Sequence, residues 1–315
     1  PVVVRPDLVE SLAASSQPEL ALRSIGQAFV ELGAELVLGN TLLSYWAIAS
    51  AHASGLPSLW AQHESEPWAT YFDHLAGPLR EIAYRSFAYP SRVITVAEAT
   101  RRAWQPVETR RNFQVIRHGI PADRLRRDVD RWTREQARRK LRVPAGVQVF
   151  TVVGTVTERK GQLDLVQAFR ELDPSLQARS IVFLAGRIAS PDYAAEITRA
   201  AADCSSNIVL TGEIEDPFLY LRASDVAVCT SRIESAPRVL LEAMACALPI
   251  ITTPVFGIPE MVAEGVNALF YEPGDVAVLA NAMTGLHDDQ RRAMLAAASP
   301  LVLASLPDFD DMVDG

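Results

Sequence analysis

Hydrophobic and polar positions follow two different patterns along this chain. Short continuous apolar runs are typical of buried strands, and stretches whose apolar residues recur every three or four positions are typical of helices. Up to residue 130 the two kinds of segment alternate, which predicts a parallel sheet covered by helices. The expected strands lie at 1–4, 34–40, 57–62, 92–96 and 113–116, and the expected helices at 18–32, 42–54, 77–87 and 97–104.

The alternation continues through the second half of the chain. Expected strands lie at 148–153, 181–185, 208–210, 225–230, 249–253 and 267–271, and expected helices begin near 161 and occupy 192–202, 217–223, 238–246, 261–265, 276–286 and 307–313. A chain of 315 residues can form two domains that each bury a core. We therefore predict an α/β protein with a first domain at 1–122 and a second domain at 123–315.

The stretch 231–249, SRIESAPRVLLEAMACALP, organises the second domain. Strand, loop, helix and strand follow one another here as a βαβ unit, with Pro237 in the first turn of the helix, where its missing N–H costs nothing. Glu234 lies in the loop, and Glu242 lies a little over one turn inside the helix. Such loops open at the carboxyl ends of the strands, where α/β folds bind ligands. Ionised carboxylates there suit the hydroxyl groups of a sugar or a ribose.

A second loop of interest follows the strand at 148–153. It reads GTVTERKG, so that Gly154 ends the strand and Arg159 and Lys160 lie beside the start of the next helix. Backbone donors, a helix dipole and a lysine together form a site suited to a diphosphate.

The stretch 231–249 resembles the E-x7-E signature of the retaining glycosyltransferases of the GT-B architecture, family four (glycosyltransferase group one), including its EAMA-x-x-LP-I continuation. The resemblance implies two Rossmann-like domains that face each other across a cleft. It also implies that Glu234 contacts the donor sugar and that Glu242 contacts the nucleotide ribose. The residues between the two glutamates that belong to the donor site are Ser235, Ala236, Pro237, Arg238 and Val239.

The loop after Gly154 is also similar to this family, in which it reads G-R-L and then K-G. Lys160 matches the lysine that neutralises the leaving diphosphate, whereas Thr155 occupies the usual arginine position. Arg159 is the first candidate to replace that arginine, and Arg238 is the second. The resemblance further places three residues that follow strands in the donor site, the last of them near the base: Gly186, Arg187 and Ile214.

The first domain is similar to the acceptor-side domain of the family in the segments WAQHE, SRVITVAEATRR and FQVIRHGIPADRL. His63 aligns with a family position that lines the catalytic cleft near the donor sugar; the alternative is a structural histidine beside Trp60. No Gly-rich loop precedes residue 34, so we expect this domain to be short or incomplete. The segment 307–313 is similar to the start of the last helix, which in the family returns to the first domain.

Composition excludes several other classes. A net charge of -8 and the absence of a nucleic-acid-binding motif argue against a nucleic-acid partner. Three scattered cysteines are expected to be reduced thiols, which indicates a cytoplasmic protein, and the N-terminus has neither a signal peptide nor a membrane-spanning run.

The histidines lack metal-binding spacing, and the aspartates at 308–311 are expected to be solvated. We therefore expect no metal and no cofactor.

Arginines are concentrated at 124–142. A basic amphipathic stretch can lie on an anionic membrane, and many members of the family use lipid-linked acceptors, so peripheral contact with the cytoplasmic membrane face is one interpretation. The alternative is a solvated helix in which Asp128, Asp130 and Glu135 balance the charge.

Our leading hypothesis is a retaining, metal-independent glycosyltransferase that moves a sugar from a nucleotide diphosphate sugar to a hydroxyl of a sugar or lipid-linked acceptor. The catalytic residues would be Glu234, Lys160, Arg159 and His63. An epimerase or phosphorylase of the same fold is one alternative. A nucleotide-sugar-binding subunit without catalysis is the other, which the missing Gly-rich loop and Thr155 would explain.

Overall fold

The computed structural model describes residues 17–204 and 206–314, which form two compact units that divide between Arg117 and His118. The sequence analysis places this boundary at residue 123. Each unit is an α/β structure with a parallel sheet, as expected. The strand expected at 1–4 lies outside the described residues.

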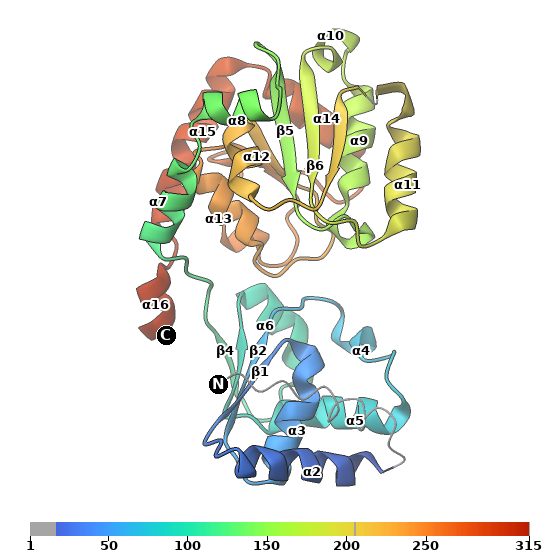
Figure 1. Cartoon of the computed structure of the whole chain (residues 1–315), viewed down its shortest axis with the longest axis vertical. Helices are drawn as coiled ribbons and strands as arrows, with labels where there is room; N and C mark the ends of the chain where they lie inside the picture. The colour runs from blue at the N-terminus through green and yellow to red at the C-terminus, as the bar shows by residue number, and fades with distance from the viewer. Residues whose placement is uncertain (1–16, 205, 315) are drawn as a thin grey trace. The chain divides into compact units, whose positions relative to one another are not determined.

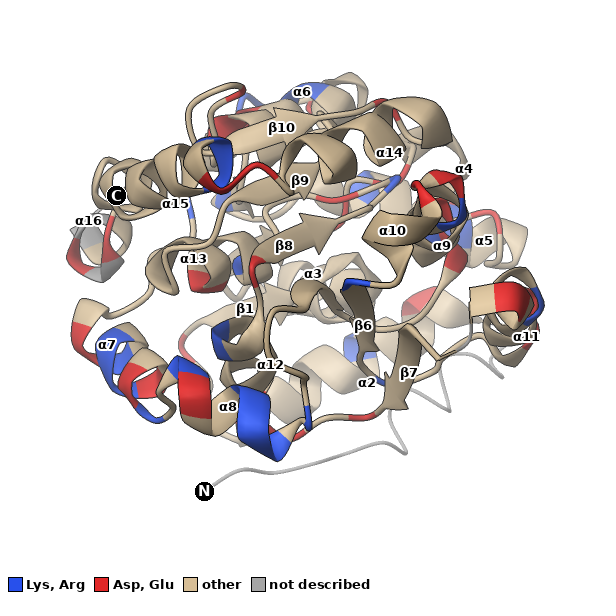
Figure 2. Cartoon of the chain, turned by 90° about the horizontal axis from the view of Figure 1, so that it is seen from above, with Lys and Arg blue, Asp and Glu red and all other residues tan. Residues whose placement is uncertain are grey.

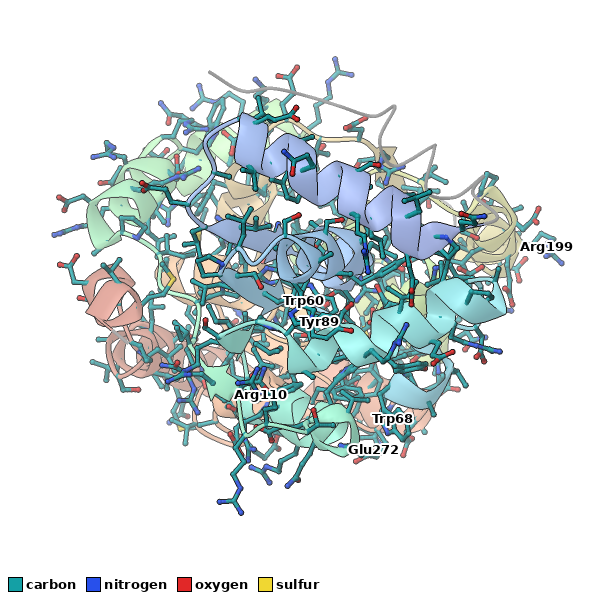
Figure 3. The ribbon with its side chains drawn as sticks, turned by 90° about the horizontal axis from the view of Figure 1, so that it is seen from below. Trp60, Trp68, Tyr89, Arg110, Arg199 and Glu272 are labelled. Atoms are coloured by element: carbon teal, nitrogen blue, oxygen red, sulfur yellow. The ribbon has the colours of Figure 1, made fainter. Side chains whose placement is uncertain are left out.

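The sheet of the first unit has the order β1-β2-β3-β4, and its paired strands are parallel. Trp60 lies in the middle of β2 (Figure 3) and is fully buried. Its indole N–H donates to the Thr41 carbonyl at 2.8 Å. This hydrogen bond satisfies the one polar atom of a large core side chain. The strands are β1 (Val37–Asn40), β2 (Ser58–Gln62), β3 (Arg92–Thr95) and β4 (Phe113–Val115).

The longer helices pack beside this sheet because each has apolar residues to bury. Leu22 and Ile25 lie on the buried face of α2, which packs against α3. Gly26 permits the close approach, because a Cβ atom there would overlap the Ser50 carbonyl. The helices are α2 (Pro18–Glu31), α3 (Tyr45–Ala53), α4 (Trp68–Tyr71), α5 (Gly77–Arg85) and α6 (Glu98–Trp104), with 3-10 turns η1 (Leu42–Ser44), η2 (Ser86–Ala88) and η3 (Gln105–Val107).

The sheet of the second unit has the order β10-β9-β8-β5-β6-β7 and is also parallel. The chain starts in the middle at β5, moves outward through β6 to β7, and then returns to β8 before moving outward on the other side. The point where the direction reverses lies between β5 and β8, and α/β folds bind ligands beside it. The strands are β5 (Gln148–Val153), β6 (Ser180–Ala185), β7 (Ile208–Gly212), β8 (Val226–Cys229), β9 (Ile250–Thr252) and β10 (Ala268–Phe270).

Helices cover both faces of this second sheet. One core cluster includes residues of α9 (Gln162–Glu171), α11 (Pro191–Ala200) and α14 (Val276–Gly285), and another includes residues of α12 (Pro217–Ala223) and α13 (Arg238–Ala245) (Figure 1). The remaining elements are α7 (Ala122–Asp130), α8 (Arg134–Lys140), α10 (Pro174–Gln177), α15 (Asp289–Ala304), α16 (Phe309–Asp314), η4 (Glu158–Lys160), η5 (Ala202–Cys204) and η6 (Ile258–Glu260).

Two expectations about local structure were wrong, and one helix was not expected. The arginine-rich stretch forms two helices rather than one, because Thr133 and Gln136 form a capping box that starts α8. The helix expected at 261–265 is absent, and the 3-10 turn η6 precedes that position, with Pro259 near its start. The long helix α15 was not expected, since Pro300 lies inside it.

Charges of both signs lie along α7, whereas α8 carries one acidic residue near its start and ends in a basic run (Figure 2). The arginines pair with nearby carboxylates: Arg126 with Asp123 at 2.7 Å, Arg131 with Asp128 at 2.6 Å and with Asp216 at 2.9 Å, and Arg134 with Asp225 at 2.5 Å. These pairs favour the solvated-helix interpretation, whereas membrane contact stays a prediction.

Within the ranges that the structure describes, no helix combines the length and apolar character needed to cross a bilayer. Cys204, Cys229 and Cys246 are all buried free thiols.

Candidate functional site

Two loops meet at the point where the second sheet reverses direction. One follows β5 and contains η4; the other follows β8 and leads to α13. The Thr230 hydroxyl donates to the Lys160 carbonyl at 2.6 Å, and the Arg232 amide donates to the Arg159 carbonyl at 2.8 Å. Gly161 adopts φ +65°, and a Cβ atom there would overlap the Thr230 carbonyl oxygen. The two loops therefore form one unit.

Lys160 and Glu234, one from each loop, form an ion pair in which the Lys160 ammonium donates to Glu234 Oε2. The Lys160 side chain is 19% exposed and that of Glu234 is 12% exposed, so the pair is partly shielded from solvent but still accessible. The Ser231 hydroxyl lies 3.3 Å from the same oxygen, and Arg159 Nη1 lies 3.7 Å from it. Arg159 also donates to the Ile233 carbonyl at 3.0 Å. The structure thus brings together three of the four predicted catalytic residues.

The helix α13 begins four residues after Glu234. Pro237 is its N-cap residue, so the first N–H groups of the helix, those of Arg238 and Val239, have no intrahelical acceptor. A helix N-terminus attracts anions, and a lysine beside it adds a positive charge. The neighbouring Glu234 can accept hydrogen bonds from hydroxyl groups. An anion linked to a polyhydroxyl group fits this chemistry.

The start of α9, also predicted to bind an anion, is partly occupied by internal contacts. The Leu163 amide donates to the Tyr193 hydroxyl at 2.9 Å, and the Asp164 amide donates to the Gly161 carbonyl at 3.0 Å. Burial raises the pKa of Tyr193 to about 12, so its hydroxyl stays neutral. The N-terminus of α13 therefore has more groups to offer a ligand than that of α9.

Glu242 lies on α13 with a different set of charged neighbours. Its carboxylate is 3.9 Å from Arg238 Nη2, and its side chain is 15% exposed. Burial raises the pKa of Glu242; Arg238 and Arg124 lower it, and Asp128 raises it further. The structure gives Glu242 neighbours on α7 and α13, whereas the neighbours of Glu234 lie in the two loops. A ribose-binding role for Glu242 stays a prediction.

The other residues predicted to bind the donor follow the strands or lie at the start of α13. The Gly154 amide donates to the Ala185 carbonyl at 2.9 Å, and a Cβ atom on Gly186 would overlap the Gly154 carbonyl, so the ends of β5 and β6 lie very close together. The Thr155 carbonyl accepts from the buried Gln162 amide group at 2.9 Å. Of the rest, Ser235 and Pro237 are buried, Ala236, Val239 and Ile214 are partly buried, and Arg187 and Arg238 are exposed.

His63 belongs to the first unit, directly after β2. Its Nε2 lies 2.8 Å from Asn40 Oδ1 at the end of β1, a partner that the sequence analysis missed. The Glu64 carboxylate accepts from the Leu42 amide at 3.2 Å and from the His63 amide at 3.0 Å. Burial raises the pKa of Glu64, and these hydrogen bonds oppose the rise. The imidazole is therefore held by both strand ends, but a catalytic role for it stays a prediction.

Two further residues of the second unit were missed. Asp164 and Arg232 form an ion pair directly below the two loops, with Oδ1 and Nη2 separated by 2.6 Å. Asp164 stands among Leu163, Leu165 and Val166 in an otherwise apolar part of α9. An aspartate in such a position needs a buried partner, and this pattern could have identified Asp164 from the sequence.

Residues 147–289 match the family described as "Glycosyl transferases group 1". Among curated proteins, the alpha-maltose-1-phosphate synthase of Mycobacterium tuberculosis is 27% identical, and the match covers 88% of this chain and 79% of that protein. The D-inositol 3-phosphate glycosyltransferase of Corynebacterium efficiens is 32% identical over 49% of this chain and 38% of that protein.

Two solved structures share the fold. Anabaena HepE in complex with UDP and glucose has a TM-score of 0.78 at 22% identity, over 95% of this chain and 81% of that chain. Sucrose-phosphate synthase of Thermosynechococcus elongatus also has a TM-score of 0.78, at 21% identity, over 99% of this chain and 77% of that chain. The parallel α/β units thus have the GT-B architecture, and the second unit contains the stretch that matches the group 1 glycosyltransferase family.

Proposed function

We propose that the protein transfers a sugar from a nucleotide diphosphate sugar to an acceptor hydroxyl. The observation that carries this proposal is the ion pair between Lys160 and Glu234. The pair lies where the second sheet reverses direction, close in sequence to the N-terminus of α13. The pair offers one positive group to a diphosphate and one acceptor group to sugar hydroxyls. The match of residues 147–289 to the glycosyltransferase family supports the reaction class.

In the proposed reaction, the bond between the anomeric carbon and the diphosphate breaks as the acceptor oxygen bonds to that carbon. Negative charge develops on the departing diphosphate, and Lys160, Arg159 and the amide groups at the start of α13 stabilise it. Glu234 holds the sugar hydroxyls, and Glu242 holds the ribose. The acceptor hydroxyl attacks the face that the diphosphate leaves and passes its proton to the departing diphosphate oxygen, so that the anomeric configuration is retained. These protein charges supply the stabilisation without a metal ion.

The comparisons favour particular substrates for first tests. HepE was crystallised with UDP-glucose, which supports a uridine donor. The curated relatives are named for a maltose phosphate and for an inositol phosphate, which supports a sugar or polyol acceptor. A lipid-linked acceptor is the second class to test. Three buried free thiols support a reducing compartment such as the cytoplasm.

Thermal unfolding with UDP, GDP and ADP and their glucose conjugates tests the donor, because a ligand bound only by the native state raises Tm. Transfer is then assayed with and without EDTA, and the anomeric configuration of the product is read by NMR. Retained configuration with EDTA present supports the whole proposal. Binding without turnover favours the non-catalytic subunit, and isomerised or phosphorolysed donor favours the epimerase or phosphorylase.

A further inference from the structure

Asp164 is a buried carboxylate in the first turn of α9, and its side chain is only 2% exposed. Its Oδ1 accepts from Arg232 Nη2 at 2.6 Å, and its Oδ2 accepts from the Gly274 amide at 2.9 Å. Each oxygen therefore has a partner from a different segment. A buried charge without such partners would be strongly unfavourable, so the arrangement is specific.

The two partners lie in loops at the carboxyl ends of separate strands. Arg232 follows β8, and Gly274 lies between β10 and α14, where it adopts φ +88°. Asp164 itself follows the loop after β5. One carboxylate thus joins α9 to the loops that follow β8 and β10, and all three segments border the same end of the sheet.

Arg232 transmits this contact to the candidate site. It is two residues before Glu234, and its own amide donates to the Arg159 carbonyl at 2.8 Å. The guanidinium end of Arg232 is held by Asp164, while its backbone is held by the loop that carries Lys160. Movement of the Arg232 side chain would therefore shift the backbone of the loop 231–234 and change the position of the Glu234 side chain.

Stability alone is a poor explanation for a buried ion pair at this position. Apolar residues of similar volume often stabilise a core at least as well as a buried ion pair does. An ion pair differs from them in fixing direction, because the carboxylate accepts only along its lone pairs and the guanidinium donates only in its plane.

We propose that Asp164 is a positioning residue, which acts through Arg232 to hold the loop 231–234 in the geometry that keeps Lys160 and Glu234 paired. The inference rests on the proposed function for its catalytic consequence. Asp164 touches neither Lys160 nor Glu234, so its effect on the reaction is indirect. A misplacement of about 1 Å costs on the order of a hundredfold in rate, and we expect a loss of tenfold to a hundredfold here.

The test uses Asp164→Asn, Arg232→Gln and the double variant. Asp203→Asn is the matched control, because it removes the carboxylate of an exposed ion pair with Arg170, which lies on the same helix as Asp164. We expect kcat of both single variants to fall about tenfold to a hundredfold while the KM for the donor changes much less. The double variant should be little worse than either single variant, because both act through one contact.

A second readout needs no substrate. Hydrogen exchange at the amide groups of residues 230–234 should become faster in Asp164→Asn and in Arg232→Gln, and should stay unchanged in Asp203→Asn. If the wild-type protein transfers no sugar, the proposed function fails, while exchange still decides whether Asp164 holds the loop. Unchanged exchange, or a double variant whose losses simply multiply, overturns the inference. Arg232→Lys keeps a positive charge opposite Asp164 but loses the planar donor group, so it provides a folded variant if Asp164→Asn does not fold.

Discussion

Gly161 and the carbonyl oxygen of Thr230 are so close that a Cβ atom on residue 161 would overlap that oxygen. Gly161 lies between η4 and α9, and Thr230 directly follows β8. The close approach allows the Thr230 hydroxyl to reach the Lys160 carbonyl at 2.6 Å. The proximity of Lys160 to Glu234 therefore depends on the missing side chain of one residue.

Gly161→Ala should weaken both the fold and donor binding. The substitution adds a methyl group where there is no space and places alanine at φ +65°. We expect a loss of about 1–3 kcal/mol in the free energy of unfolding, together with weaker donor binding. Gly146→Ala is the control, since Gly146 has φ +73° but nothing within 4 Å of its Cβ position. Urea unfolding and donor titration measure both effects. Equal losses in the two variants would mean that only the backbone angle matters.

Removing either member of the Lys160–Glu234 pair should abolish most of the transfer and leave the fold intact. In Lys160→Ala, Glu234 retains contacts with Ser231 and Arg159, so no carboxylate is left without a partner. We expect kcat for Lys160→Ala and for Glu234→Ala to fall about 10²–10³-fold, the range seen when one charge-stabilising group is lost. Steady-state kinetics and circular dichroism test this. Arg170→Ala is the control, and normal turnover in both site variants would refute the assignment.

The strands and helix that form the candidate site were predicted correctly, because each depends on residues that are neighbours in the sequence. Apolar runs identify β5, β8 and β9, and Pro237 marks the start of α13. Glu234 and Lys160 follow strands, and in a parallel sheet the ends of adjacent strands meet. The structure confirms that these two residues lie together. Their partnership follows from the strand order, in which β5 and β8 are neighbours.

Contacts between distant residues were not predictable in the same way. Asp164 and Arg232 are separated by 68 positions, and nothing near either residue identifies the other. The close approach of Gly161 to Thr230 likewise exists only after the loops fold against each other. The helix α15 was not predicted because Pro300 usually marks the end of a helix, whereas here it lies inside one. Sequence patterns predict elements well, whereas the contacts that align a site depend on the tertiary structure.

Glu242→Gln should stabilise the protein at neutral pH. Burial raises the pKa of Glu242, with Arg238 and Arg124 opposing and Asp128 adding to the rise. A carboxyl group with a raised pKa in the folded state favours folding below its ordinary pKa, and this contribution is lost as pH rises through the raised value. Glutamine stays neutral throughout. The variant should therefore be more stable than the wild type at about pH 7.5, and the difference should vanish at about pH 4.

Urea unfolding at both pH values measures this difference, and Glu196→Gln, an exposed position on α11, is the control. The same variant should bind the donor less tightly if Glu242 holds the ribose, since an amide accepts hydrogen bonds less strongly than a carboxylate. Greater stability with unchanged donor affinity would show that Glu242 is a buried charge without a part in binding.

Asp225→Ala should destabilise the second unit without a direct effect on the donor site. Asp225 precedes β8 and so lies at the end of the strand opposite to Glu234. Its carboxylate is 12% exposed, pairs with Arg134 at 2.5 Å and with Arg138 at 3.4 Å, and accepts from the Val149 amide at 2.8 Å. Alanine would leave the Val149 amide without its acceptor and both arginines without their charge partner, which should cost about 3–5 kcal/mol in the free energy of unfolding.

Asp203→Ala provides the comparison, because Asp203 is 87% exposed and its ion pair with Arg170 should contribute less than about 1 kcal/mol. Urea unfolding should separate the two variants clearly. The KM for the donor should stay at the wild-type value in both, measured where each is fully folded, because neither residue contacts the two loops. A large rise in KM for Asp225→Ala alone would show that the two ends of β8 are coupled, and that the site depends on more of the sheet than its carboxyl edge.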